Sequence, residues 1–174
     1  MVKIYFDGAS EPNPGNSSIG VVIIKQKKTY YTLAKNIGFH TNNEAEFIAL
    51  QKALEKALEL RLYYVSVYGD SKIVIESMNK RWKISKLNLL RIKSEIDLLV
   101  RSFKKIEFKW IPRESNSKAD HYSKIGLNSD QEILKVAKQE VKKQKFCPLF
   151  DQSQDHGKVK SLTREEINAL YHSK

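Results

Sequence analysis

Residues 41–50 have the sequence TNNEAEFIAL, and this stretch predicts the start of a helix. Thr41 is a favoured N-cap residue, and Glu44, three positions later, can complete a capping box with it. The residues that follow are rich in Ala, Leu, Glu and Lys, which are strong helix formers. We therefore expect a helix from Asn42 to about Leu60.

A second acid in this stretch, Glu46, has no such local explanation. At helical spacing it falls on the same face as Leu50, Ala53 and Ala57, which form an apolar stripe. A carboxylate on a core-facing stripe is costly unless it is paired or bound to a metal ion. Glu46 is therefore a candidate functional residue.

Two further acids, Asp7 and Asp70, each follow an apolar run that favours a β-strand. The chain from the first of these runs to the second contains the predicted helix, and such a crossover makes the two strands parallel neighbours. Asp7 and Asp70 then lie at the same carboxyl edge of the sheet, where α/β folds build their sites. Alternation puts Tyr5 on the side of Asp7, and Tyr68 on the side of Asp70.

The remaining pattern predicts an α/β chain. The predicted strands are residues 2–6, 19–26, 29–37, 63–69 and 106–111, with the first three forming an antiparallel meander. Residues 8–18, rich in Pro, Gly and Asn, are predicted to be a loop. Further helices are predicted at 71–79, at 87–103 with Leu89, Leu90, Ile92, Ile96, Leu99 and Val100 on its apolar face, and from Ser115 or Asn116 to a terminating Gly126.

Composition limits the classes of protein to consider. The chain has 174 residues, of which 41% are hydrophobic, and this suits one domain with an appendage. No apolar run is long enough to span a membrane, and the first residues favour a strand and not a signal peptide. Cys147 is the only cysteine, which excludes disulfides within the chain and indicates a reducing, cytoplasmic setting. The net charge of +11 suggests a polyanionic partner, although lysine-rich surfaces also serve solubility alone.

A fourth acid, Asp120, lies in the first turns of the helix after the last strand. Its position there also suits the helix dipole, so this simpler explanation stays open. Clustered carboxylates repel one another, and bound divalent cations relieve the repulsion. A site with oxygen ligands alone favours Mg2+ or Mn2+ over Zn2+.

Four motifs in this order give the chain a resemblance to a known family. They are Asp7-Gly8 with Asn13-Pro14-Gly15, the stretch 41–46, Gly69-Asp70-Ser71, and Lys109-Trp110-Ile111 followed by Asn116 and Ala119-Asp120. The chain resembles type 1 ribonuclease H (ribonuclease HI) over roughly residues 1–127. The resemblance implies the ribonuclease H-like fold, a five-stranded mixed sheet with strands 1–3 antiparallel and strands 4–5 parallel, flanked by helices.

The family's activity is cleavage of the RNA strand of an RNA–DNA hybrid, which leaves 5′-phosphate and 3′-hydroxyl ends. Its four catalytic and metal-binding acids correspond to Asp7, Glu46, Asp70 and Asp120, which would hold two Mg2+ ions, with Mn2+ as the alternative. Residues expected to contact the hybrid are Ser10, Asn13, Thr41, Asn42, Asn43, Lys80, Arg81, Trp82 and Lys83. Simpler explanations remain for three of these: capping for Thr41, an ordinary loop for Ser10, and packing on a helix for Trp82.

The chain also departs from the family. Residues 112–118 contain no histidine, where many members have one before the last catalytic acid; Arg113 and Glu114 are the candidates to replace it. The basic loop at 80–86 is short, as in compact members without the longer basic handle. A non-catalytic module that binds a hybrid or a partner, and a nuclease with another nucleic-acid substrate, remain alternatives.

Residues 129–174 match no pattern of the family. We expect a catalytic domain at 1–128 and a C-terminal helical extension at 129–174 that folds back on the core or binds a protein partner. We expect the protein to be a monomer.

Overall fold

The structure is a computed structural model, and it describes residues 1–128. The predicted helical extension, residues 129–174, lies outside the described residues. The strands are β1 (Val2–Glu11), β2 (Gly15–Lys25), β3 (Lys28–His40), β4 (Tyr64–Gly69) and β5 (Lys105–Trp110). The helices are α1 (Asn42–Glu59), α2 (Lys72–Met78), α3 (Leu87–Val100) and α4 (Ser117–Leu127), with a short 3-10 helix, η1 (Arg113–Asn116), before α4.

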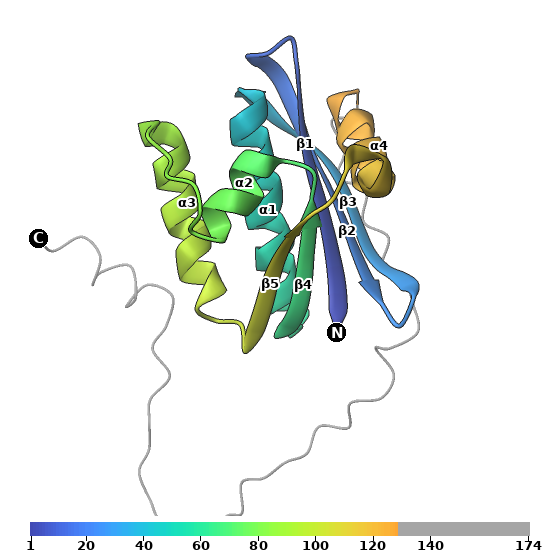
Figure 1. Ribbon diagram of the computed structural model, residues 1–174. Helices are drawn as coiled ribbons and strands as arrows, with labels where there is room; N and C mark the ends of the chain where they lie inside the picture. Colours follow the sequence, from blue (N-terminus) through green and yellow to red (C-terminus); the bar gives the residue numbers. More distant parts are fainter. Residues whose placement is uncertain (129–174) are drawn as a thin grey trace, which may run out of the picture. The chain divides into compact units, whose positions relative to one another are not determined.

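The five strands form one mixed sheet in the order β3-β2-β1-β4-β5 (Figure 1). The pairs β1–β2 and β2–β3 are antiparallel, whereas β1–β4 and β4–β5 are parallel. This arrangement confirms the predicted fold class. Because β1 and β4 are parallel neighbours, their carboxyl ends lie at the same edge of the sheet.

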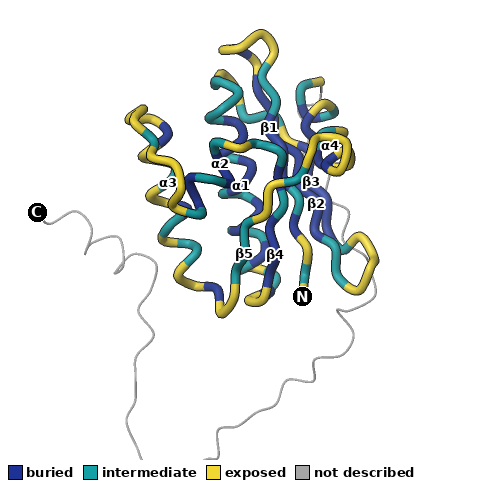
Figure 2. Tube along the Cα trace, viewed as in Figure 1, coloured by how far each residue is buried: buried dark blue, intermediate teal, exposed yellow. Residues whose placement is uncertain are grey.

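The core lies between α1 and one face of the sheet. Helix α1 buries residues including Phe47, Leu50 and Leu54, which pack in one cluster with residues of β1 and β4 such as Phe6 and Val67. Helix α3 packs against α1, and α4 packs on the opposite face of the sheet, on β1, β2 and β3. Figure 2 shows the resulting burial, with dark blue concentrated in the central strands and yellow on the outer side of α3 and on the loops. No helix among residues 1–128 is long and apolar enough to cross a membrane.

The capping box predicted at the start of α1 is present. The backbone N–H of Glu44 donates to Thr41 Oγ1 at 3.3 Å, and the backbone N–H of Thr41 donates to Glu44 Oε2 at 2.8 Å. This reciprocal pair fixes where the helix begins, and it therefore fixes the direction in which Glu46 points.

The predicted loop at residues 8–18 is wrong. Strand β1 continues to Glu11 and β2 begins at Gly15, so only a tight turn at residues 12–14 separates them. The turn-forming prolines are confined to that short segment, and Gly8 has a different purpose. A Cβ atom on Gly8 would lie 2.3 Å from the backbone of Ala45 and Glu46, so the glycine allows α1 to approach β1 closely.

Two helix predictions were also wrong. Gly126 does not end α4, which runs to Leu127; a Cβ at Gly126 would lie 2.9 Å from Ser18 Cβ, so this glycine permits close packing on the sheet. In α3, Leu89 and Ile96 are buried, but Leu90 is exposed because it lies about 100° around the helix from Leu89.

The close approach at Gly8 gives a first prediction. Gly8→Ala should destabilise the protein, by about 1–3 kcal/mol, because the new methyl group meets the backbone of α1 and overpacking costs this much. Gly38→Asn is the matched control, because Gly38 has a positive φ of 83°, nothing lies within 4 Å of its Cβ position, and Asn tolerates this backbone conformation. Urea unfolding of both variants measures the difference; equal stabilities would contradict the close approach.

Candidate active site

Three of the four predicted acids converge at the carboxyl edge of β1 and β4. Asp7 lies within β1, Asp70 directly follows β4, and Glu46 lies in the second turn of α1. Each offers a carboxylate oxygen, and these oxygens all lie within 4.8 Å of one another. We call Asp7, Glu46 and Asp70 the acidic triad.

The triad is buried and electrostatically unfavourable without a cation. Asp7 is 5% exposed and Glu46 is 7% exposed, while Asp70 is partly buried. Burial, followed by the charges of Asp7 and Asp70, raises the pKa of Glu46 well above its usual range. Burial also raises the pKa of Asp7 to about 6, with contributions from Asp70 and Asp120 and against the opposing hydrogen bond from Ser123.

The donor set fits a divalent cation. Glu46 Oε2 is buried and has no hydrogen-bond partner among the described residues, although a buried carboxylate oxygen normally has one. The ligand atoms of the triad are all carboxylate oxygens, which are the donors that Mg2+ and Mn2+ prefer. A cation held by the triad would supply the missing partner and neutralise the repulsion.

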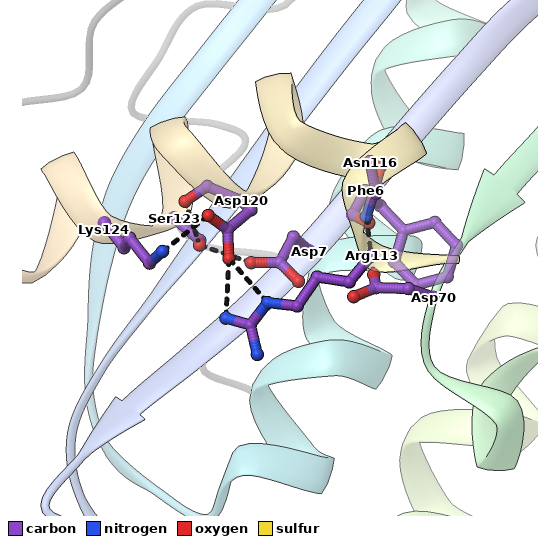
Figure 3. A network of polar contacts seen from close by, with 8 residues as sticks. All are labelled: Phe6, Asp7, Asp70, Arg113, Asn116, Asp120, Ser123 and Lys124. Carbon is purple, nitrogen blue, oxygen red and sulfur yellow. Dashed lines mark hydrogen bonds and ion pairs between the residues drawn. The ribbon is translucent and has the colours of Figure 1, made fainter. Parts of the chain in front are cut away.

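Helix α4 and its preceding turn hold two of the triad acids in place (Figure 3). Asn116 Nδ2 donates to Asp70 Oδ1 at 2.6 Å and to the backbone carbonyl of Phe6 at 2.9 Å. Ser123 Oγ donates to Asp7 Oδ2. Asn116 and Ser123 are both buried, so these contacts are shielded from water.

Ser123 did not emerge from the sequence as a site residue, and Asn116 emerged only as part of a motif. The signal that could have found them is helical spacing. Asn116, Asp120 and Ser123 are four and three positions apart, so they lie on one face of a helix. A polar face next to the predicted acids indicates a supporting role for these side chains.

The fourth acid, Asp120, does not belong to the triad cluster. Arg113 contacts Asp120 Oδ1 through Nη2 at 2.7 Å and Nε at 3.2 Å, and Lys124 Nζ contacts Oδ2 at 2.6 Å (Figure 3). Burial opposes ionisation, but the hydrogen bonds from Lys124 and Arg113 outweigh it and lower the pKa of Asp120. Asp120 lies in the first turn of α4, so the dipole explanation also remains.

All four acids nevertheless line one hollow of about 230 Å³. Arg113 lines it as well, whereas Glu114, the other candidate to replace the missing histidine, is not among its lining residues. The hollow therefore combines four carboxylates with an arginine whose side chain is 68% exposed.

The predicted contact residues near α1 fall into two groups. Ser10 and Asn42 line the hollow beside the acids. Asn13 Oδ1 accepts a hydrogen bond from the backbone N–H of Asn42 at 2.9 Å, so Asn13 helps to cap α1. Thr41 has its capping role, and Asn43 is partly buried in the first turn of the helix.

The predicted basic loop lies elsewhere. Lys80, Trp82 and Lys83 line a separate hollow of about 420 Å³ between the loop and α3. Trp82 is 52% exposed, and Arg81 forms an ion pair with Glu76 at 3.1 Å. The structure thus does not bring these four residues to the acids.

Comparison with known proteins identifies the family. The family model described as reverse transcriptase-like matches residues 5–126. The crystal structure of RNase H1 from the halophilic archaeon Halobacterium salinarum is 31% identical, with a TM-score of 0.71, and the match covers 73% of this chain and 97% of that one. This chain belongs to the ribonuclease H family.

Two other members of the ribonuclease H family illustrate the range of the match. LC11-RNase H1, solved in complex with an RNA/DNA hybrid, is 31% identical with a TM-score of 0.70, and the match covers 74% of this chain and 97% of that one. The bifunctional protein Rv2228c of Mycobacterium tuberculosis is 34% identical over 130 residues, which are 74% of this chain. The match covers only 36% of Rv2228c, so this chain spans about a third of that relative's length.

The buried triad gives a second prediction, on stability without metal. In the native state the pKa of Asp7 rises from 3.8 to about 6, so the native state binds the proton more tightly than the unfolded state. Metal-free protein should therefore lose stability as pH rises from about 4 to above 6, by roughly 3 kcal/mol for this group alone. Asp7→Asn should remove the loss and raise the melting temperature at pH 8.

The control is Asp120→Asn, which acts on an acid with a lowered pKa. It removes the contacts with Arg113 and Lys124, so it should leave the melting temperature unchanged or lower it. Thermal melts at pH 4.5 and pH 8 with a chelator test both variants. A melting temperature for Asp7→Asn below that of the wild type at pH 8 would show that the charge of Asp7 does not destabilise the folded protein.

Proposed function

We propose that residues 1–128 are the catalytic domain of a metal-dependent endonuclease that hydrolyses the RNA strand of RNA–DNA hybrids, giving 5′-phosphate and 3′-hydroxyl ends. The observation that carries this proposal is the acidic triad with the unpartnered oxygen of Glu46. A buried group of three acids is unfavourable for stability, and membership of the ribonuclease H family gives it a chemical purpose.

In this proposal Asp7, Glu46 and Asp70 would hold a divalent cation, Mg2+ with Mn2+ as the alternative, and Asp120, which lines the same hollow, would help to hold a second. When bound, the two cations supply the activation of the attacking water and the stabilisation of the leaving 3′ oxygen. Asn116 and Ser123 keep the carboxylates of Asp70 and Asp7 in a fixed orientation, so little reorganisation is needed before the reaction.

Arg113 is the residue that we propose in place of the missing histidine. It lines the hollow, it is largely exposed, and it contacts Asp120 through two nitrogens. An arginine in this position can bind a phosphate oxygen of the substrate, because its planar guanidinium matches phosphate geometry.

The hybrid as substrate rests on two supports. The related LC11-RNase H1 was solved with an RNA/DNA hybrid. In this chain Ser10 and Asn42 line the hollow next to the acids, and Asn13, Thr41 and Asn43 lie at or beside the start of α1. We propose that these polar side chains contact the hybrid. Asparagine side chains can contact the 2′-hydroxyl that distinguishes RNA from DNA.

We propose that the basic loop binds the DNA strand at a distance from the acids. Lys80, Arg81 and Lys83 supply positive charge, and the exposed Trp82 supplies an aromatic surface for the backbone. We also propose that the protein acts in the cytoplasm as a monomer and that residues 129–174 serve contact with the core or with a protein partner.

The third prediction tests catalysis and separates two glutamates on one helix. Glu46→Gln should lower hybrid cleavage by orders of magnitude, because an amide is a poor ligand for a divalent cation. Glu44→Gln should cost little, since Gln can still accept the hydrogen bond from the backbone of Thr41. Cleavage is measured with Mg2+ on a hybrid, a double-stranded RNA and a double-stranded DNA of one sequence.

Wild-type protein should cut the RNA strand of the hybrid. If the protein cut only the double-stranded DNA, the hybrid would not be its substrate. If it cut none of the three duplexes, the protein would be a non-catalytic binding module. Undiminished cleavage by the Glu46→Gln variant would contradict the proposed role of the triad.

The fourth prediction concerns the basic loop. Affinity for the hybrid should fall steeply with salt, and replacing Lys80, Arg81 and Lys83 by Ala together should weaken binding and flatten the salt dependence. A control replaces Lys27, in the turn between β2 and β3, and Lys28, the first residue of β3, by Ala; both are exposed, and the control removes two positive charges where the test variant removes three. A salt dependence as steep as that of the wild type would show that the loop does not touch the nucleic acid.

A further inference from the structure

A row of side chains crosses the whole sheet on the face that carries Asp7. The strand register pairs Thr32 with Val22, Val22 with Tyr5, Tyr5 with Tyr68, and Tyr68 with Lys109. Residues paired in this way project from the same face of a sheet. We call Thr32, Val22, Tyr5, Tyr68 and Lys109 the transverse row.

The described helices leave the end of this row on β4 and β5 uncovered. Helices α1, α2 and α3 pack in the core on the other side of the sheet, and the main strand contacts of α4 are with β1, β2 and β3 (Figure 1). On β4 and β5, Tyr64 is 54% exposed and the side chains of Lys105 and Lys109 are 57% and 50% exposed. Within residues 1–128 the row is therefore exposed at Lys109 and partly exposed at Tyr5 and Tyr68, whereas Val22 and Thr32 are buried beneath α4.

The open part of the row is aromatic and basic. The rings of Tyr5 and Tyr68 stack with centroids 5.0 Å apart, and Lys3 Nζ lies 5.9 Å from the centroid of the Tyr68 ring. Glu107 pairs with Lys105 at 3.2 Å and with Lys109 at 3.0 Å, so this one acid meets two of the lysines. Lys3 adds a further positive charge, and the strip as a whole is positive.

The other end of the row opens into a hollow of about 270 Å³. Val22 and Thr32 line it from the sheet, and residues of α4, including Lys118, His121 and Tyr122, line it from the helix. Thr32 is 1% exposed, and its Oγ1 has no hydrogen-bond partner among the described residues. A buried hydroxyl without a partner can accept or donate a hydrogen bond to a group that enters the hollow.

We propose that the transverse row and its hollow bind an unpaired nucleic-acid strand that continues from the duplex in the active site. Stacked aromatic rings on an open sheet face, flanked by lysines, are the features that bind the faces of bases and the phosphates between them. A duplex would not fit this role, because its base faces are already covered by neighbouring base pairs. The proposal rests on the proposed function, since it takes the acids as the place where the duplex binds.

The row is also continuous with the active site. Tyr5 lies two positions before Asp7 and Tyr68 two positions before Asp70, and two residues of a strand span about 7 Å. A nucleic-acid strand that extends from the acids along β1 and β4 therefore reaches Tyr5 and Tyr68 first. Lys109 lies beside Tyr68, where it can contact the following phosphate.

The test measures equilibrium binding of the full-length chain in the presence of a chelator, by fluorescence anisotropy. The probes are a blunt RNA–DNA hybrid, the same hybrid with a short single-stranded extension at one end or the other, and the single strand alone. We expect one extended hybrid to bind at least about fivefold more tightly than the blunt one, as stacking of one base on an aromatic ring provides.

Variants assign the gain to the row. Tyr68→Ala, and separately the pair Lys3→Glu and Lys109→Glu, should abolish the preference for the extended hybrid and leave affinity for the blunt hybrid unchanged. Tyr68→Phe keeps the ring and should keep the preference. The pair Arg91→Glu and Arg101→Glu, exposed on α3 and at its C-terminal end on the other side of the sheet, makes the same change of charge away from the row and its hollow and should keep the preference as well.

The outcomes separate this inference from the proposed function. Tight binding of the blunt hybrid with no gain from an extension overturns the inference and leaves the proposed function in place. Binding of the single strand through Tyr68, with no binding of the blunt hybrid, supports the row and overturns the proposed function. A large drop in melting temperature for the Lys3 and Lys109 pair, with no preference in the wild type, identifies the row as a packing surface for the chain itself and overturns the inference.

Discussion

The approach of α1 to β1 at Gly8 is the constraint on which the site depends. It brings Glu46 within reach of Asp7 and Asp70. The backbone of α1 occupies the space that a side chain at position 8 would fill, so only glycine fits there. Three carboxylates so close together oppose the folded state without a cation, and the hydrophobic contacts of α1 with the sheet offset this repulsion. The fold thus holds an unfavourable group of charges together through packing that is independent of those charges.

Helix α4 completes the arrangement from the other side of the sheet. Ser123 of α4 contacts Asp7, and Asn116, the residue directly before α4, connects Asp70 with the backbone of β1. Asp120 differs from the triad because it forms ion pairs with Arg113 and Lys124. These two side chains stabilise its carboxylate in the ionised form. The four acids consequently divide into three whose charges repel one another and one whose charge is balanced by Arg113 and Lys124.

The sequence predicted the parts of this fold that follow from local patterns. The capping box of Thr41 and Glu44, the parallel pairing of β1 with β4, and the inward position of Glu46 all followed from spacing, and the structure has each of them. The extent of the β1–β2 hairpin and the place of Gly126 within α4 were not predictable in this way. Gly8 and Gly126 are placed by close contacts with segments distant in the sequence, α1 for Gly8 and β2 with β3 for Gly126, which local composition does not report. The spacing of Asn116, Asp120 and Ser123 indicates one polar helix face, but which acid Ser123 contacts depends on how α4 packs on β1.

The junction between β3 and α1 has a consequence for how this protein tolerates changes in length. Strand β3 ends at His40 and α1 begins at Asn42, so Thr41 alone separates pairing in the sheet from the first turn of the helix. One inserted residue at this junction would turn Glu46 by about 100° relative to the strands or break the pairing of β3 with β2. The length of the turn between β2 and β3 is not constrained in this way, because the turn is exposed and connects only strands. Natural variation in length is therefore expected at that turn and not at the junction.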